Sequence, residues 1–198
     1  MNRKEKRIIY ADNAATTRLD QDAFEAMCPF LCENFGNASQ PYSFSRVPKN
    51  ALKIARETIA SCINASPEEI FFTSGGTESD NWALKGILKT NESQTVITSQ
   101  IEHHAILHTC ASIEQVGNKV IYLPVDRNGI VDTNTLQEAL VNKVALVSVM
   151  YANNEIGSLE PIHELCNIAH RNGAKFHTDA VQAVGHVKID VKEIGVDM

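Results

Sequence analysis

The chain has 198 residues, of which 43% are hydrophobic and 21% are charged, and it carries a formal net charge of −6. This composition is that of an ordinary globular protein. The chain is long enough to form one domain with a hydrophobic core, or a large part of a bigger domain. The acidic balance argues against nucleic acid as the main partner, and the lack of a long apolar run or an apolar signal region argues for the cytoplasm rather than a membrane.

The chain opens with a basic arm and a loop of small residues. The arm contains the basic cluster Arg3–Arg7, which is expected to be a solvated tail. Residues 11–17, Ala-Asp-Asn-Ala-Ala-Thr-Thr, are too short and too polar to form core and are expected to be an ordered loop. A plain surface connection is the alternative interpretation of this loop.

Two helices are predicted next. Asp20 is suited to cap a helix that runs to about Cys32. The side of this helix that is expected to be buried carries Ala23, Met27, Phe30 and Leu31. Residues 35–43 have turn chemistry, and a longer amphipathic helix is predicted from about Pro48 to Asn64.

From residue 70 onwards, strand-like and helical segments alternate. Strands are predicted over Ile70–Thr73, Thr95–Thr98, Lys119–Leu123, Val144–Val149 and Ala174–His177, and helices over about 77–89, 104–115, 133–142 and 161–171. Pro161 suits the first position of the last helix, and Gly173 suits its end. The alternation predicts an α/β fold with three layers, a mostly parallel sheet with helices on both faces.

A glycine turn joins the first predicted strand to the helix that follows, in the sequence Thr-Ser-Gly-Gly-Thr at residues 73–77. The glycines allow the backbone to approach a ligand closely, and Ser74 or Thr77 can cap the helix. Free N–H groups and the positive end of the helix dipole would favour a phosphate in this turn. An ordinary tight turn between strand and helix is the alternative.

Polar residues follow the other predicted strands where each one ends. His103 follows the second strand, Asn154 the fourth, and Asp179 and Gln182 the fifth. Ligands of open α/β sheets bind at the carboxyl ends of the strands, so these side chains are expected near the glycine turn.

These residue types suit a cofactor that has a phosphate, a ring nitrogen and a phenolic oxygen. A carboxylate such as Asp179 keeps a neighbouring ring nitrogen protonated, which makes the ring of pyridoxal phosphate an electron sink. The amides of Asn154 and Gln182 can donate to the ring oxygen. The imidazole of His103 can stack on the ring and move protons.

Five motifs, in this order, resemble those of cysteine desulfurases, which belong to the class V aminotransferase group of fold-type I pyridoxal phosphate enzymes. The resemblance runs from about Ile9 to the last residue. The motifs are Ala11–Thr17, Thr73–Asn81, Glu102–Ala105, Asn153–Gly157 and His177–Gln182. The resemblance implies catalysis by His103 and cofactor binding by Gly76, Thr77, His103, Asn154, Asp179 and Gln182.

The resemblance also implies a reaction and partners. Members of the family convert L-cysteine to L-alanine and leave the sulfur as an enzyme persulfide. The sulfur then passes to an acceptor scaffold protein for iron–sulfur cluster assembly, or to thiolation pathways. Family members are homodimers, so a homodimer is expected here, without nucleic acid or membrane as a partner.

The sequence departs from the family in two places. The loop at residues 36–42 lacks the family's histidine, and no Ser-x-His-Lys motif supplies the Schiff-base lysine. We therefore expect only the N-terminal part of such an enzyme, with residues 1–17 as arm and active-site loop and 18–198 as a truncated large domain. The C-terminal small domain and its cysteine loop are expected to be absent. Such a chain should be inactive alone and leave a sheet edge uncovered.

Other functions are consistent with the same features. The chain could be a non-enzymatic remnant or a dimerising partner of a full-length relative. Another class V enzyme, such as a selenocysteine lyase, is a further alternative.

Several residues also have plainer interpretations. His103 could be a satisfied polar residue at a helix start, and Asp179 could cap the helix after the last strand. His104 and His108 have a spacing that can bind zinc, but no third ligand is evident, so no metal is expected. The cysteines, expected to be buried free thiols rather than disulfide or metal ligands, are Cys28, Cys32, Cys62, Cys110 and Cys166.

Overall fold

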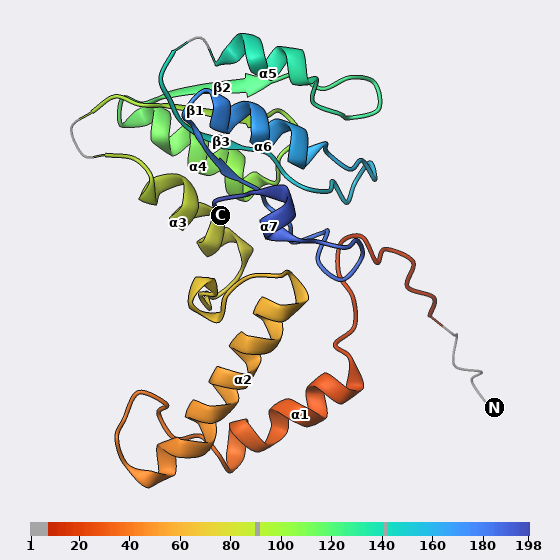
Figure 1. Ribbon diagram of the computed structural model, residues 1–198. Helices are drawn as coiled ribbons and strands as arrows, with labels where there is room; N and C mark the ends of the chain where they lie inside the picture. Colours follow the sequence, from red (N-terminus) through yellow and green to blue (C-terminus); the bar gives the residue numbers. More distant parts are fainter. Residues whose placement is uncertain (1–7, 90–91, 141) are drawn as a thin grey trace, which may run out of the picture. The chain divides into compact units, whose positions relative to one another are not determined.

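The computed structural model describes residues 8–89, 92–140 and 142–198, so the basic cluster Arg3–Arg7 lies outside the described residues. The chain divides into two compact units, Met1–Ala55 and Arg56–Met198 (Figure 1). Within the described residues, no helix is both long enough and apolar enough to cross a membrane.

The first unit contains the predicted first helix. Helix α1 spans Gln21–Cys32, and the Asp20 carboxylate accepts the N–H groups of Asp22 at 2.9 Å and Ala23 at 3.2 Å. The predicted start and cap of this helix are confirmed. The helix tolerates an internal proline at Pro29.

The prediction that one side of α1 is buried was wrong. No residue of the helix is buried, and Met27, Phe30 and Leu31 are all exposed. A periodic apolar pattern marks a helix face that is able to pack, but it does not supply the surface that the face packs on.

A short 3₁₀ turn, η1, at Ser43–Ser45 leads into α2, which spans Arg46–Cys62 and continues into the second unit. The rings of Phe35 and Phe44 meet edge to face at 5.2 Å and stabilise the connection between α1 and α2. The predicted second helix is confirmed, with both boundaries two residues earlier than expected.

The second unit is built on a parallel sheet, as predicted. Its strands are β1 at Thr95–Ser99, β2 at Lys119–Leu123, β3 at Val144–Ser148 and β4 at Lys175–His177. They lie in the order β2-β1-β3-β4, and all three pairs are parallel. The reversal of order beside β1 is typical of open α/β sheets that bind ligands at their carboxyl edge.

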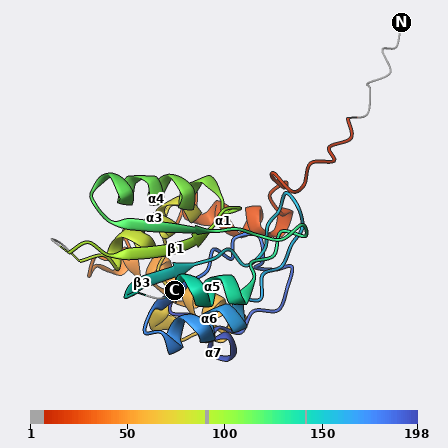
Figure 2. The same ribbon diagram turned by 90° about the horizontal axis from the view of Figure 1, so that it is seen from above.

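Helices cover both faces of this sheet (Figure 2). They are α3 at Gly76–Gly86, α4 at His104–Gln115, α5 at Thr133–Ala139, α6 at Ile162–Arg171 and α7 at Val191–Ile194. Adjacent residues of β1 point to opposite faces: Val96 packs with residues of α3 and α4, whereas Ile97 packs with residues of α5 and α6. The predicted three-layer arrangement is therefore confirmed.

The predicted strand at Ile70–Thr73 is wrong. After the 3₁₀ turn η2 at Pro67–Glu69 the backbone is extended, but within the described chain it pairs with no strand. The Ile70 carbonyl instead accepts a hydrogen bond from the Arg56 guanidinium, which also lies 4.8 Å from the centre of the Phe72 ring. A strand requires a neighbour, and none of the described strands lies beside this segment.

Pro161 and Gly173 lie at the two ends of α6, as predicted, but Pro161 lies one position earlier than expected. Pro161 precedes the helix as its N-cap rather than occupying its first position. Gly173 adopts a φ of 75° and donates its N–H to the His170 carbonyl, which ends the helix as predicted. The short helix α7 was not predicted; the Asp190 carboxylate caps it and also accepts the Asn64 amide at 2.9 Å.

Replacement of Phe176 by alanine tests the core around β4. Phe176 is completely buried and belongs to the cluster that joins the sheet to α5 and α6. We expect Phe176→Ala to lower the free energy of unfolding by about 3–5 kcal/mol, measured by urea denaturation. Val116, which is 76% exposed, provides the control, since Val116→Ala should change the value by less than about 0.5 kcal/mol. Equal effects of the two substitutions would contradict this packing.

Candidate cofactor site

The N-terminus of α3 is not capped by the residues that the sequence suggested. Gly75 is the N-cap residue and no side chain caps the helix, so the prediction of Ser74 or Thr77 as cap was wrong. The Glu78 carboxylate accepts the Ser74 N–H at 2.6 Å, and the hydroxyls of Thr73 and Ser79 are 2.8 Å apart. Among the described contacts, none uses the N–H of Gly76 or Thr77, which leaves both donors available for an anion.

Gly76 brings α3 against the loop after β4. A Cβ atom at this position would lie 3.1 Å from Cγ2 of Val181, closer than almost all real contacts of this type. The glycine therefore allows a backbone approach that a larger residue would disturb. This contact places the two free N–H groups next to the segment that carries Asp179.

Asp179 lies in that segment, two residues beyond the end of β4. Its carboxylate is buried and accepts the N–H of Val181 at 2.9 Å. Its main-chain carbonyl accepts the N–H of Tyr151 at 2.9 Å, which ties the loop after β4 to the loop after β3. The carboxylate thus stands at the carboxyl edge of the sheet in a fixed orientation.

A second buried acid joins β1 to β3. One oxygen of Glu102 accepts both the Ser99 hydroxyl at 2.6 Å and the Met150 N–H at 2.9 Å. The other oxygen, Oε2, is buried and has no hydrogen-bond partner in the described structure. Burial raises the pKa of Glu102 to about 8, against the lowering effect of the two hydrogen bonds. A protonated carboxyl group is therefore the form that this site favours at neutral pH.

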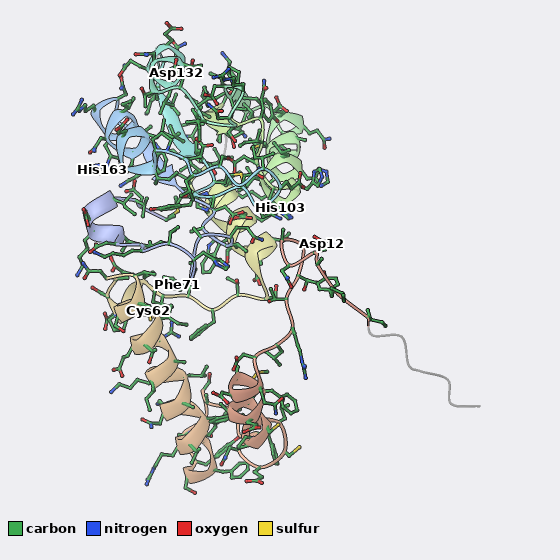
Figure 3. All side chains as sticks on the ribbon, turned by 90° about the vertical axis from the view of Figure 1, so that its right-hand side faces the viewer. Asp12, Cys62, Phe71, His103, Asp132 and His163 are labelled. Carbon is green, nitrogen blue, oxygen red and sulfur yellow. The ribbon has the colours of Figure 1, made fainter. Side chains whose placement is uncertain are left out.

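Glu102 sets the position of His103, the next residue and the N-cap of α4. The imidazole Nδ1 accepts the Ala105 N–H at 3.1 Å, so a neutral ring carries its proton on Nε2. Figure 3 shows His103 at the end of α4 that lies at this edge. His103 and Thr77 line the same cavity of about 310 Å³, together with side chains of α3 and α4 that include Asn81 and Lys85.

Three buried polar groups lie behind Asp179. Asp80, on α3, has its Oδ1 3.8 Å from Nε2 of His177, whose Nδ1 is 2.9 Å from the Ser148 hydroxyl. Burial, with a smaller effect from the Asp179 charge, raises the pKa of Asp80 to about 7. Burial lowers the pKa of His177 to about 4, despite the opposing charge of Asp179. The His177 ring is therefore neutral at neutral pH, and its approach to Asp80 is not an ion pair.

Asn154 lies on the loop after β3 and Gln182 on the loop after β4, and neither lines the cavity that His103 and Thr77 share. The adjacent Asn153 donates to the Ile101 carbonyl at 3.0 Å and accepts the N–H of Glu155 at 2.8 Å. Asn153 holds the loop after β3 against the loop after β1. Asn154 is left at the same edge with its assigned role untested.

Sequence reasoning missed the buried groups that support this edge. Asp80, Glu102, Ser148 and His177 were not proposed as site residues. A signal was present for three of them, because Asp80 lies within the glycine-turn motif, Glu102 directly precedes His103, and His177 begins the motif that contains Asp179. Their burial, which gives them their unusual acid–base behaviour, could not be read from the sequence.

The described structure shows no support for a metal site. The rings of His104 and His108 stack with centroids 5.2 Å apart. Within the described residues, no group of three or more His, Cys, Asp or Glu side chains is placed to hold a metal ion.

All five cysteines are free, as predicted, but they are not all buried. Cys110 and Cys166 are buried, and burial raises their pKa values to about 12 and about 11, which makes both poor nucleophiles. Cys32 and Cys62 are exposed and Cys28 is half-buried, so the expectation of buried thiols was wrong for these residues. Cys28 and Cys32 lie on α1, in which no residue is buried, and Cys62 is the exposed last residue of α2.

Comparison with known proteins identifies the family to which the chain belongs. The sequence matches the family described as aminotransferase class-V over residues 9–198. The chain belongs to the class V aminotransferase family. Members of this family use pyridoxal phosphate.

Several relatives of the chain are named as cysteine desulfurases. "Cysteine desulfurase IscS" of Methanosarcina thermophila is 50% identical over 196 residues, which cover 98% of this chain and 48% of that protein. A solved structure described as "NIFS-LIKE PROTEIN" has a TM-score of 0.90 and 37% identity, over 94% of this chain and 52% of its own. "SspA in complex with cysteine" also has a TM-score of 0.90, with 35% identity, over 95% and 55%. The chain thus spans about half the length of the relatives that it matches.

The protonated state of Glu102 predicts an unusual pH dependence. Between about pH 4.5 and 8 the unfolded chain loses a proton that folded Glu102 keeps, so rising pH lowers stability through this group. Through this group the free energy of unfolding should fall by up to about 1.4 kcal/mol for each pH unit. Glu102→Gln cannot ionise and retains one acceptor oxygen, so its free energy of unfolding should fall less over this range. Urea denaturation at a series of pH values measures the difference.

Glu138 provides the matched control for this experiment because it is exposed on α5. The pH dependence of Glu138→Gln should be parallel to that of the unmodified chain. A Glu102→Gln curve that is also parallel would show that Glu102 is ionised in the folded protein.

Proposed function

We propose that this chain is the cofactor-binding portion of a pyridoxal phosphate-dependent cysteine desulfurase. The observation that carries the proposal is the buried carboxylate of Asp179, held at one sheet edge beside the free N–H groups of Gly76 and Thr77. The family match over residues 9–198 and the 50% identity to a cysteine desulfurase support the same assignment.

The residues at this edge fit pyridoxal phosphate. The N–H groups of Gly76 and Thr77, at the positive end of α3, would hold the phosphate. Asp179 would pair with the protonated ring nitrogen, and Asn154 and Gln182 would contact the ring oxygen. Pyridoxal phosphate bound here supplies an electron sink for the substrate.

His103 is suited to hold and move a proton at this site. Because its Nδ1 accepts the Ala105 N–H, its Nε2 is the nitrogen that can exchange a proton with a bound molecule. Glu102, the preceding residue, fixes the backbone beside His103 through its bonds to Ser99 and Met150. Asp80 limits the negative charge beside Asp179, since its raised pKa leaves it partly protonated at neutral pH.

The reaction we propose is the conversion of L-cysteine to L-alanine, with the sulfur left on a cysteine of the complete enzyme. A structural neighbour that is 35% identical was solved in complex with cysteine, which supports this substrate class. The five cysteines of this chain are poor candidates for the sulfur-accepting thiol, since none follows the family pattern. We further propose a homodimer in the cytoplasm that transfers sulfur to an acceptor scaffold protein for iron–sulfur cluster assembly.

The domain organisation we propose has residues 1–17 as an arm with an active-site loop and residues 18–198 as part of a large cofactor-binding domain. The chain spans 48% of a curated relative. The sequence contains no Ser-x-His-Lys motif.

Binding of pyridoxal phosphate to the purified chain tests the site. We expect weak, saturable binding, and we expect Asp179→Ala to weaken it at least about tenfold because the ring nitrogen loses its carboxylate partner. Equilibrium dialysis with absorbance detection measures both. Asp22→Ala, at an exposed residue of α1, is the control and should bind like the unmodified chain. Identical binding by the Asp179 variant would rule out the assigned role.

The missing lysine motif predicts that the chain does not turn over cysteine. After addition of pyridoxal phosphate and L-cysteine, alanine formation should not exceed that of free cofactor, and borohydride should trap no specific lysine adduct. Amino-acid analysis and peptide mass spectrometry provide the readouts. Trapping at a single lysine, or clear alanine production, would refute this prediction.

A further inference from the structure

A row of polar side chains crosses three neighbouring strands of the sheet near their carboxyl ends. Thr98 pairs in register with Ser148, and Ser148 pairs in register with His177, so the three side chains leave the same face of the sheet. All three residues are buried. Two positions earlier on their strands, Val96 and Leu146 pack with residues of α3 and α4. The polar row therefore faces the layer that contains α3.

His177 links this row to α3 through both of its ring nitrogens. Its Nδ1 lies 2.9 Å from the Ser148 hydroxyl, and its Nε2 lies 3.8 Å from Oδ1 of Asp80. The second distance is longer than a hydrogen bond, so it marks a polar contact of a weaker kind. The side chains of His177 and Asp80 are only 6% and 5% exposed, and polar contacts are stronger where water is excluded.

The contact with Asp80 bears on the start of α3. Asp80 lies four residues after Gly76, about one helical turn along the same helix. Gly76 itself packs closely on Val181, whose N–H binds the Asp179 carboxylate. The first turn of α3 is thus held at two points, by Val181 at its start and by His177 one turn later. Both of these residues belong to β4 or to the loop after it, which also carries Asp179.

We propose that His177 and Asp80 are positioning residues of the cofactor site. Through this pair, β4 fixes the first turn of α3, and with it the N–H groups of Gly76 and Thr77, at a set distance from Asp179. The inference rests on the proposed pyridoxal phosphate site, since the spacing matters only to a ligand that reaches both ends. A spacing that is set before binding lowers the entropy cost of holding such a ligand.

Two ligands separate positioning from a purely structural role. Inorganic phosphate can use the N–H groups at the start of α3 alone, whereas pyridoxal phosphate also meets Asp179. Loss of the correct spacing should therefore weaken pyridoxal phosphate and leave inorganic phosphate nearly unaffected. A variant that only destabilises the fold should weaken both ligands alike or neither of them.

Two substitutions of His177 separate its two contacts. His177→Asn keeps a polar atom near the Ser148 hydroxyl but is too short to reach Asp80, whereas His177→Gln keeps a nitrogen at the position of Nε2. We expect His177→Asn to weaken pyridoxal phosphate binding to the purified chain at least about tenfold and phosphate binding by less than about twofold. His177→Gln should recover most of the lost affinity. His163→Asn, at an exposed histidine of α6, is the matched control and should bind both ligands normally.

A double-mutant cycle tests whether the two residues act together. Asp80→Ala should also weaken pyridoxal phosphate selectively, and adding it to His177→Asn should reduce affinity by less than about threefold more. Equilibrium dialysis measures pyridoxal phosphate, and an amide NMR titration measures phosphate. Circular dichroism establishes that each variant folds, and Asp80→Ala alone tests the proposal if His177→Asn does not fold.

Several results would overturn the inference. They are normal pyridoxal phosphate binding by His177→Asn or Asp80→Ala, equal weakening of the two ligands, and additive effects in the double variant. Failure of the unmodified chain to bind pyridoxal phosphate would instead refute the proposed function. Amide hydrogen exchange at Gly76–Asp80 then decides about positioning: His177→Asn should speed it at least about tenfold and His177→Gln should not, whereas unchanged exchange in His177→Asn would refute the role.

Discussion

The parallel register of β1, β3 and β4 is the constraint on which the candidate site depends. It brings three loops together, and hydrogen bonds then lock them: Glu102 binds the Met150 N–H, and the Tyr151 N–H binds the Asp179 carbonyl. Because each loop is fixed to its neighbour, the positions of His103 and Asp179 depend on the sheet as well as on their own hydrogen bonds. Rigid scaffolding of this kind is what a binding site on loops requires.

Burial dominates the electrostatics of this edge. It raises the pKa of both Asp80 and Glu102 and lowers that of His177, so the three groups tend to be neutral near pH 7. Asp179 lies beside these groups, whose charge at neutral pH is reduced by their burial. A carboxylate acts more strongly on a cationic ring nitrogen where little other charge competes with it.

The sequence predicted the alternating elements because each depends on local signals. Turn chemistry at Gly173 and the cap at Asp20 are properties of a few neighbouring residues, and both were found where expected. The extended segment Ile70–Thr73 and the exposed side of α1 were not predicted correctly, because pairing and burial depend on a distant surface. His103 and Asp179 follow the ends of β1 and β4, as the sequence predicted. The support from Glu102 and His177 arises only when the strands are side by side.

The close approach of Gly76 to Val181 has a consequence for ligand binding. A ligand whose anionic end draws on the start of α3 and whose other end meets Asp179 touches both sides of this contact. Because the two sides are already packed together without a ligand, binding does not have to bring them together, which lowers the entropy cost of holding both ends of one molecule.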